Sequence, residues 1–154
     1  MTMAARTAKT TKPLWTCPRC GQTFVTENLW HSCAVVPLNR HFGSSPPELR
    51  RAFDRIVALA QKNGPIAVRP VKTRIALQAN TRFASVTVRK KTLTFGVILD
   101  HAKARPPVTK VEKFGKVYGH YCVIENPTQV GAGVARMLRE AYALDRKRHG
   151  PRRA

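Results

Sequence analysis

Three of the four cysteines, together with one histidine, lie between positions 17 and 33. Cys17 and Cys20 form a Cys-x-x-Cys pair, and Gly21 directly after it permits the tight backbone that places two sulfurs on one ion. His31 and Cys33 supply a second pair. Because thiolate and imidazole are the ligands that zinc prefers, the segment predicts a zinc site with Cys17, Cys20, His31 and Cys33 as its ligands.

The second half of this site has an unusual spacing. Side chains two residues apart share a face in an extended segment but point in different directions in a helix, so residues 31–33 should not be helical if both bind. His41 is the alternative fourth ligand. Four protein ligands leave no position for water, and the zinc is therefore predicted to be structural rather than catalytic.

A redox-active Cys-x-x-Cys is the alternative chemistry for Cys17 and Cys20. Such a motif lies where a strand meets a helix in a βαβ unit, and the residues before Cys17 do not have the pattern of that strand. Clustered cysteines in a reducing compartment favour metal binding instead. The small core of the module is then expected to consist of Trp15, Phe24, Leu29 and Trp30, although an exposed Trp could also stack on a base.

Other signs of catalysis are few. The eight acidic residues are scattered, and none forms a pattern suited to Mg²⁺. His101 and His120 are single titratable groups without an evident partner, and Cys122 lies in an apolar run typical of a buried strand. The sequence has no glycine-rich phosphate loop and no nucleophile elbow. These observations name no catalytic residue and argue against an enzyme.

The charge of the chain points to a polyanionic partner. The chain has 28 Lys and Arg against 8 Asp and Glu, a formal net charge of +20. Such a surface attracts nucleic acid, because neutralised phosphates release counterions. A cluster of basic residues with one aromatic side chain lies between positions 69 and 91. It consists of Arg69, Lys72, Arg74, Arg82, Phe83, Arg89, Lys90 and Lys91. If this segment is a strand, Arg74 faces the side of the sheet opposite to Ile75 and Leu77. That side could bind phosphate, or it could simply be a solvated face.

The main domain that must position these residues has an α+β pattern. Ser45 as N-cap, Pro46 at the first helical position and Glu48 in a capping box predict a helix that ends before Gly64. Short runs rich in Val, Ile, Thr and Phe predict antiparallel strands near 66–70, 73–79, 82–89, 92–99, 109–113 and 117–124. A last helix is expected from Asn126, with both helices on one face of a sheet of five to six strands.

This pattern divides the chain into a basic arm (1–14), a zinc-finger-like module (15–36), an α+β domain (37–145) and a basic tail (146–154). No stretch approaches the ~20 consecutive apolar residues that a membrane span needs. The basic N-terminus is not followed by the apolar stretch of a signal peptide. We therefore expect a cytoplasmic protein without a membrane partner.

Several motifs, taken in order, resemble a known family. They are Trp15-Thr16-Cys17-Pro18-Arg19-Cys20-Gly21 with Phe24, Asn28 and His31-Ser32-Cys33, then Pro-Pro-Glu-Leu-Arg, Phe53-Asp54-Arg55, Gly64-Pro65, Lys72-Thr73-Arg74-Ile75-Ala76 and Phe83-Ala84. Over roughly residues 15–145 the chain resembles the bacterial domain-of-unknown-function family 5655. The resemblance implies a small α+β domain without an assigned activity, in which Lys72, Thr73, Arg74 and Phe83 face a common ligand.

The leading hypothesis from the sequence is a non-enzymatic, zinc-stabilised protein that associates with DNA or RNA. One alternative is a domain that binds a small anionic ligand or handles metal. A second alternative is an enzyme of unrecognised type that uses Lys72 and Arg74 with His101 or His120.

Overall fold

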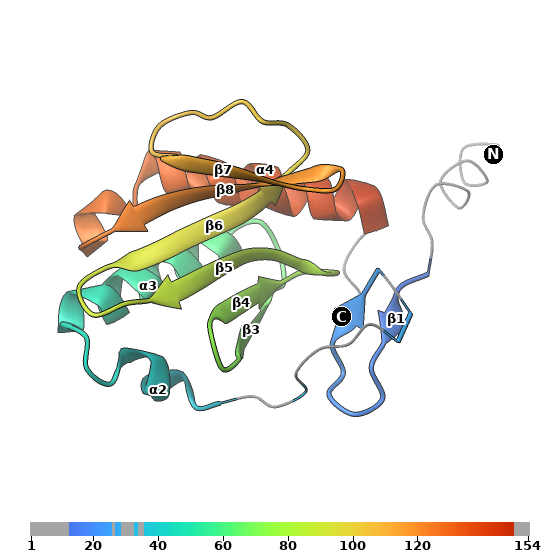
Figure 1. Cartoon of the computed structure of the whole chain (residues 1–154), viewed down its shortest axis with the longest axis horizontal. Helices are drawn as coiled ribbons and strands as arrows, with labels where there is room; N and C mark the ends of the chain where they lie inside the picture. Colours follow the sequence, from blue (N-terminus) through green and yellow to red (C-terminus); the bar gives the residue numbers. More distant parts are fainter. Residues whose placement is uncertain (1–12, 26, 29–32, 34–35, 150–154) are drawn as a thin grey trace.

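The computed structural model describes residues 13–25, 27–28, 33 and 36–149. A two-stranded hairpin near the N-terminus precedes a larger α+β domain (Figure 1). The elements of the hairpin and the helices are β1 (Trp15–Thr16), β2 (Thr23–Phe24), α2 (Leu38–Phe42), α3 (Pro47–Gln61), the 3-10 turn η1 (Pro127–Gln129) and α4 (Ala132–His149). The strands of the main sheet are β3 (Ala67–Pro70), β4 (Ile75–Gln78), β5 (Arg82–Val88), β6 (Leu93–Leu99), β7 (Lys110–Phe114) and β8 (Val117–Ile124).

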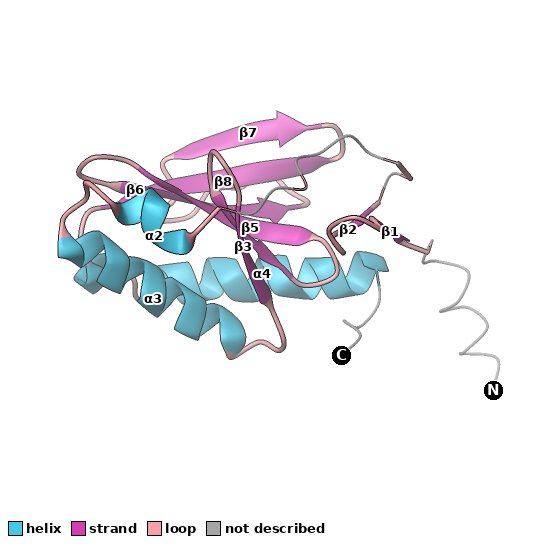
Figure 2. Cartoon of the chain, turned by 90° about the horizontal axis from the view of Figure 1, so that it is seen from below, coloured by secondary structure: helices cyan, strands magenta, loops and turns pink. Residues whose placement is uncertain are grey.

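The main sheet confirms the predicted α+β architecture. Its six strands are all antiparallel, in the order β3-β4-β5-β6-β8-β7. Helices α3 and α4 both lie on one face of the sheet, and the opposite face carries no described long helix (Figures 1 and 2). None of the helices in the described part of the chain is long and apolar enough to cross a membrane.

The register of the strands separates a core face from an outer face. Directly paired residues form rows across the sheet, and neighbouring rows face opposite sides because side chains alternate along each strand. One row on the helix side, the inner row, consists of Val68, Leu77, Ala84, Val97, His120 and Val111. The next row faces away from the helices and is called the outer row: Arg69, Ala76, Ser85, Gly96, Tyr121 and Lys110.

The helices bury the stripes that their spacing predicts. On α3, Leu49, Phe53, Ile56 and Ala60 are at most 2% exposed. On α4 the buried stripe contains Val134, Met137, Leu138 and Ala141, and both stripes join the sheet in one core. Burying a side chain of this size contributes about 1.5–3 kcal/mol. Packing against the sheet therefore holds both helices in place.

The starts of the two helices differ from expectation. Pro46, not Ser45, is the N-cap of α3, and no side chain caps this end. Pro46 precedes Pro47 and is held in the extended region, so the helix cannot begin before Pro47. The Asn126 capping box does form, but it closes the 3-10 turn η1, and α4 begins only at Ala132 and continues to His149.

A buried carboxylate joins α4 to the turn between β4 and β5. Asp145 is 5% exposed. Its oxygens accept hydrogen bonds from the backbone N–H groups of Asn80 (2.8 Å) and Thr81 (3.1 Å) and from the Thr81 hydroxyl (2.6 Å). Three donors satisfy the charge that would otherwise be costly to bury. The end of α4 is thereby tied to one end of the sheet.

We predict that Asp145→Ala lowers the free energy of unfolding by roughly 3 kcal/mol, because three buried donors lose their acceptor. Urea denaturation followed by circular dichroism measures the change. Asp54→Ala on α3 is the matched control, since Asp54 is exposed and paired only with Arg50 at i,i+4. Its cost should be about 0.5 kcal/mol or less. Equal losses for the two variants would contradict the assigned role of Asp145.

Candidate metal centre and outer sheet face

The Cys-x-x-Cys pair lies in a tight turn between β1 and β2. Trp15 pairs with Phe24 across this hairpin, and their rings are 6.1 Å apart. Within the turn the Cys17 N–H donates to the Gln22 carbonyl, and the Gly21 N–H donates to the Cys17 carbonyl, both at 2.8 Å. Gly21 has φ +76°, a conformation that favours glycine. The turn therefore has the backbone that the sequence predicts. We call residues 13–28 and 33 the cysteine module.

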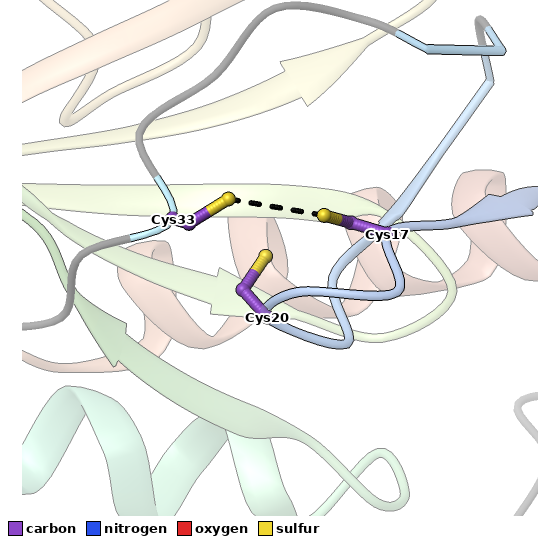
Figure 3. Close-up of side chains that lie close together, drawn as sticks. All are labelled: Cys17, Cys20 and Cys33. Atoms are coloured by element: carbon purple, nitrogen blue, oxygen red, sulfur yellow. Dashed lines mark hydrogen bonds between the residues drawn. The ribbon is translucent and has the colours of Figure 1, made fainter.

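Three sulfur atoms meet at this turn. The Sγ atoms of Cys17, Cys20 and Cys33 all lie within 4.8 Å of one another (Figure 3). The Sγ atoms of Cys17 and Cys33 are 3.8 Å apart, and none of the four cysteines forms a disulfide. Two sulfurs bound at about 2.3 Å to one tetrahedral zinc lie about 3.8 Å apart. The three cysteines could therefore hold a metal ion such as zinc.

The thiols have shifted acidities. Burial raises the pKa of Cys17, but backbone hydrogen bonds at Arg19 and Cys20 outweigh it, so the net pKa lies below the ordinary value. For Cys33, burial and then the neighbouring Cys17 and Cys20 raise the pKa. The thiolate form is thus favoured at Cys17, while the neighbouring Cys33 resists ionisation. A cation at the centre would remove this conflict, because it favours the thiolate form of every ligand.

The fourth ligand is predicted to be His31, with His41 as the alternative. His31 lies outside the described residues, so its role stays a prediction. His41 lies in α2 and is not among the described ligand atoms that gather at the three sulfurs. No described helix begins at the Cys17–Cys20 turn, so this part of the chain lacks the strand-to-helix junction of a redox motif.

Side chains fasten the cysteine module to the main sheet. The Gln22 side-chain amide Nε2 donates to Cys20 Sγ at 3.4 Å, and Gln78 Nε2 in β4 donates to the Gln22 side-chain oxygen Oε1 at 3.4 Å. The Thr23 hydroxyl donates to the Asn80 carbonyl. The contacts fall on β4 and on the same β4–β5 turn that Asp145 holds from the helix side. The arrangement of one metal ligand is therefore coupled to the sheet.

The outer row combines charge, small residues and one aromatic ring. Arg69 lies at the β3 end and Lys110 at the β7 end, with Ala76, Ser85 and Gly96 between them and Tyr121 next to Lys110. Arg74 lies two residues before Ala76 and therefore on the same face. Glu112 is also on this face and pairs with Lys110 at 3.3 Å.

Tyr121 lies flat on this face. A Cβ atom added at Gly96 would come within 2.5 Å of Cδ1 and Cε1 of the ring, and one added at Gly119 within 2.8 Å of Cε2 and Cζ. The two edges of the ring thus rest on two glycines of neighbouring strands. Sequence reasoning did not select Tyr121. The only feature of the sequence that could have indicated it is the presence of Gly96 and Gly119 inside strands, since a glycine there often marks the close approach of another group to the backbone.

Charges surround the phenol of Tyr121. Its pKa is raised, first by partial burial and then by Glu112, while Arg82, Arg74 and Lys110 act in the opposite direction. The pKa of Arg82 is lowered, first by partial burial and then by the positive charge of Arg74. Arg74 and Arg82 lie at opposite ends of the β4–β5 pair, because one directly precedes β4 and the other is the first residue of the antiparallel β5, and both act on the ionisation of Tyr121.

The remaining residues of the predicted anion site are divided by the fold. Lys72 and Thr73 are exposed in the β3–β4 turn, and Arg89, Lys90 and Lys91 are exposed in the β5–β6 turn at the same end of the sheet. Phe83 does not belong with them, because it is 1% exposed and packs edge-on against Tyr142 of α4.

A β-bulge explains the position of Phe83. Leu77 pairs with Ala84, but Gln78 pairs with Arg82, so β5 has one extra residue at this point. The bulge breaks the alternation that would have placed Phe83 beside Ser85 on the outer face. It lets Phe83 enter the core while Arg82 stays exposed.

The two histidines considered for catalysis are not brought to the outer face. His120 belongs to the inner row, is 1% exposed, and its Nε2 hydrogen-bonds to the His101 carbonyl at 2.7 Å. His101 Nε2 lies 3.5 Å from a carboxylate oxygen of Glu140 on α4. The sheet thus separates His120 from Arg74. Cys122 is also buried, and burial raises its pKa to about 11, so it stays a neutral thiol.

The fold and site together define an α+β domain with an appended cysteine module. Residues 39–145 match the model of DUF5655, a domain of unknown function, and the chain belongs to this family. The match covers α3, the whole six-stranded sheet and α4 as far as Asp145, and it leaves the three close cysteines outside. No curated protein and no solved structure matches the chain.

We predict that the purified protein contains one zinc ion per chain and that Cys20→Ser lowers this content toward zero, because a hydroxyl is a poor zinc ligand at neutral pH. Elemental analysis measures the metal. Cys122→Ser is the matched control and should keep one zinc, since Cys122 is buried in β8 away from the site. His31→Ala should lose zinc and His41→Ala should keep it; the reverse result would contradict His31 as the fourth ligand.

We also predict that Gly96→Ala lowers the free energy of unfolding by roughly 1–2 kcal/mol, because the added Cβ would overlap the Tyr121 ring. The loss should disappear when Tyr121→Ala is already present. Denaturant unfolding of the four proteins in this double-mutant cycle measures the coupling. Gly131→Ala serves as control, since an added Cβ there meets no atom within 4 Å. Additive effects at Gly96 and Tyr121 would show that the ring does not rest on Gly96.

Proposed function

We propose that this protein is a non-enzymatic, zinc-stabilised module that binds nucleic acid through the outer face of its sheet. The observation that carries the proposal is the outer row, with a cation at each end, small residues between, and Tyr121 beside Lys110, where Arg74 and Arg82 act on its phenol. A formal net charge of +20 supports a polyanionic partner.

The dimensions of the outer row suit a phosphate backbone. Six strands at about 4.8 Å separation place Arg69 and Lys110 about 24 Å apart. One strand of B-form nucleic acid carries a phosphate every ~3.4 Å of helix axis, so this width spans several phosphates of one strand. Between the cations, the small residues Ala76, Ser85 and Gly96 do not project far from the sheet surface. A strand of nucleic acid could therefore lie along the row.

Zinc would act on the structure rather than on a reaction. Three thiolates and His31 would close the coordination sphere and leave no position for substrate. The metal would order the cysteine module, whose contacts at Gln78 and Asn80 flank the start of β5. Arg82 is the first residue of that strand. The metal would thus support one of the cations proposed to meet phosphate.

An open face favours a polymer over a small anion. Small-ligand sites are usually concave and place their polar groups around one point. The cations of the outer row instead stand on separate strands across its width. A small-anion function is the alternative. It would be favoured if a mononucleotide, measured beside the oligonucleotide in the test below, bound with equal affinity.

We predict that reversing the charge of Arg74 and Arg82 to Glu weakens oligonucleotide binding at least about tenfold at 100 mM salt and flattens the salt dependence, because fewer counterions are released. Fluorescence anisotropy of a labelled oligonucleotide measures both. Arg51→Glu in α3 with Lys62→Glu at its C-cap is the matched control, since both residues are exposed on the helix side and the net charge changes equally. If both double variants lose the same affinity, total charge rather than the outer face determines binding.

A further inference from the structure

We infer that Tyr121 is a stacking platform for an unpaired base, so that the ligand of the outer face is single-stranded nucleic acid. This inference rests on the proposed function and makes its ligand specific. It starts from the flat orientation of the ring on Gly96 and Gly119 and from the cations around it.

The orientation of the ring leaves one aromatic face available. Atoms from both edges of the ring contact the sheet, so its plane lies along the sheet surface rather than standing upright. One face is covered by the backbone of β6 and β8, and the side chain remains partly exposed on the other. A ring fixed in this way can stack on a base without losing rotamer freedom at binding.

The neighbouring residues match the two parts of a nucleotide. Lys110 pairs with Tyr121 in the register of β7 and β8, and Arg74, Arg82 and Lys110 lower the pKa of the phenol while Glu112 raises it. Three cations and one carboxylate therefore act on the ring, and the cations could bind the phosphates of a stacked nucleotide. Beside the ring, the outer row continues with Gly96, Ser85 and Ala76. Their small side chains leave space above the sheet for the next nucleotide. Stacking with surrounding cations is the common mode of single-strand binding without strong sequence preference.

A duplex does not fit this arrangement equally well. Its bases are stacked on one another and present only their edges in the grooves. A ring that lies along the surface of a sheet cannot insert between them. The phosphates of a duplex can still contact the cations, and duplex binding should therefore be weaker and independent of the Tyr121 ring.

The test compares three labelled DNA probes of about twelve nucleotides, within the site sizes of single-strand binding folds: oligothymidylate, an abasic strand and a duplex. Fluorescence anisotropy with the full-length protein gives each affinity. Tyr121→Leu should weaken binding of oligothymidylate roughly 5- to 150-fold, as expected for the loss of one base stack. The same variant should leave the abasic strand and the duplex within about twofold, because their phosphate contacts are intact.

Two further variants separate stacking from general damage to the sheet. Tyr121→Phe keeps the ring and should recover most of the lost affinity. Phe114→Leu is the matched control, since Phe114 is an exposed aromatic on the same face. It lies at the far end of β7 from Lys110, with Glu112 between them. Its affinity for oligothymidylate should stay within about twofold of the parent. Thermal unfolding confirms that each variant is folded.

The outcomes distinguish this inference from the proposal on which it rests. If Tyr121→Leu binds oligothymidylate as tightly as the parent, or loses equal affinity for the abasic strand, stacking on Tyr121 is wrong while phosphate binding stands. If the duplex binds as tightly as the single strand, the assignment of the ligand is wrong. If the parent protein binds none of the probes at low salt, the proposed function fails together with the inference.

Discussion

The strand register is the constraint on which the two faces of this protein depend. The inner and outer rows are adjacent, so a slip of one residue would carry Arg69, Tyr121 and Lys110 toward the helices and expose the inner row. Burial of unpaired cations would be costly, and the lost apolar contacts would add to that cost. The same hydrophobic burial that holds α3 and α4 against the sheet therefore determines which residues are presented on the opposite side.

The turn between β4 and β5 is the second point at which distant parts of the chain meet. Asp145 holds its backbone from α4, while Thr23 and the Gln22–Gln78 pair approach from the cysteine module. The hydrogen bonds that this buried carboxylate accepts from the β4–β5 turn come from two backbone N–H groups and a hydroxyl. They hold the turn in place where the cysteine module contacts it.

The candidate sites were predictable to different degrees. Cys17, Cys20 and Cys33 could be selected from ligand chemistry and spacing, because a metal site needs few residues that lie close in the chain. The cations of the sheet could be selected by their charge. Which of them lie together on one face could not be predicted from the sequence. Phe83 shows why: one extra residue in β5 turns it into the core, and nothing local in the sequence marks that bulge.

The sequence by itself determined the fold class, the apolar stripes of α3 and α4, the approximate strands and the cysteine cluster, because hydrophobic period, helix-start residues and ligand spacing act over a few neighbours. Only the tertiary structure decided that β8 lies between β6 and β7, that Asp145 captures a turn 65 residues away, and that Tyr121 rests on Gly96 and Gly119. These outcomes depend on which strands lie side by side. Alternation along a strand states which side chains are buried, but it carries no information about the strand that will pair with it.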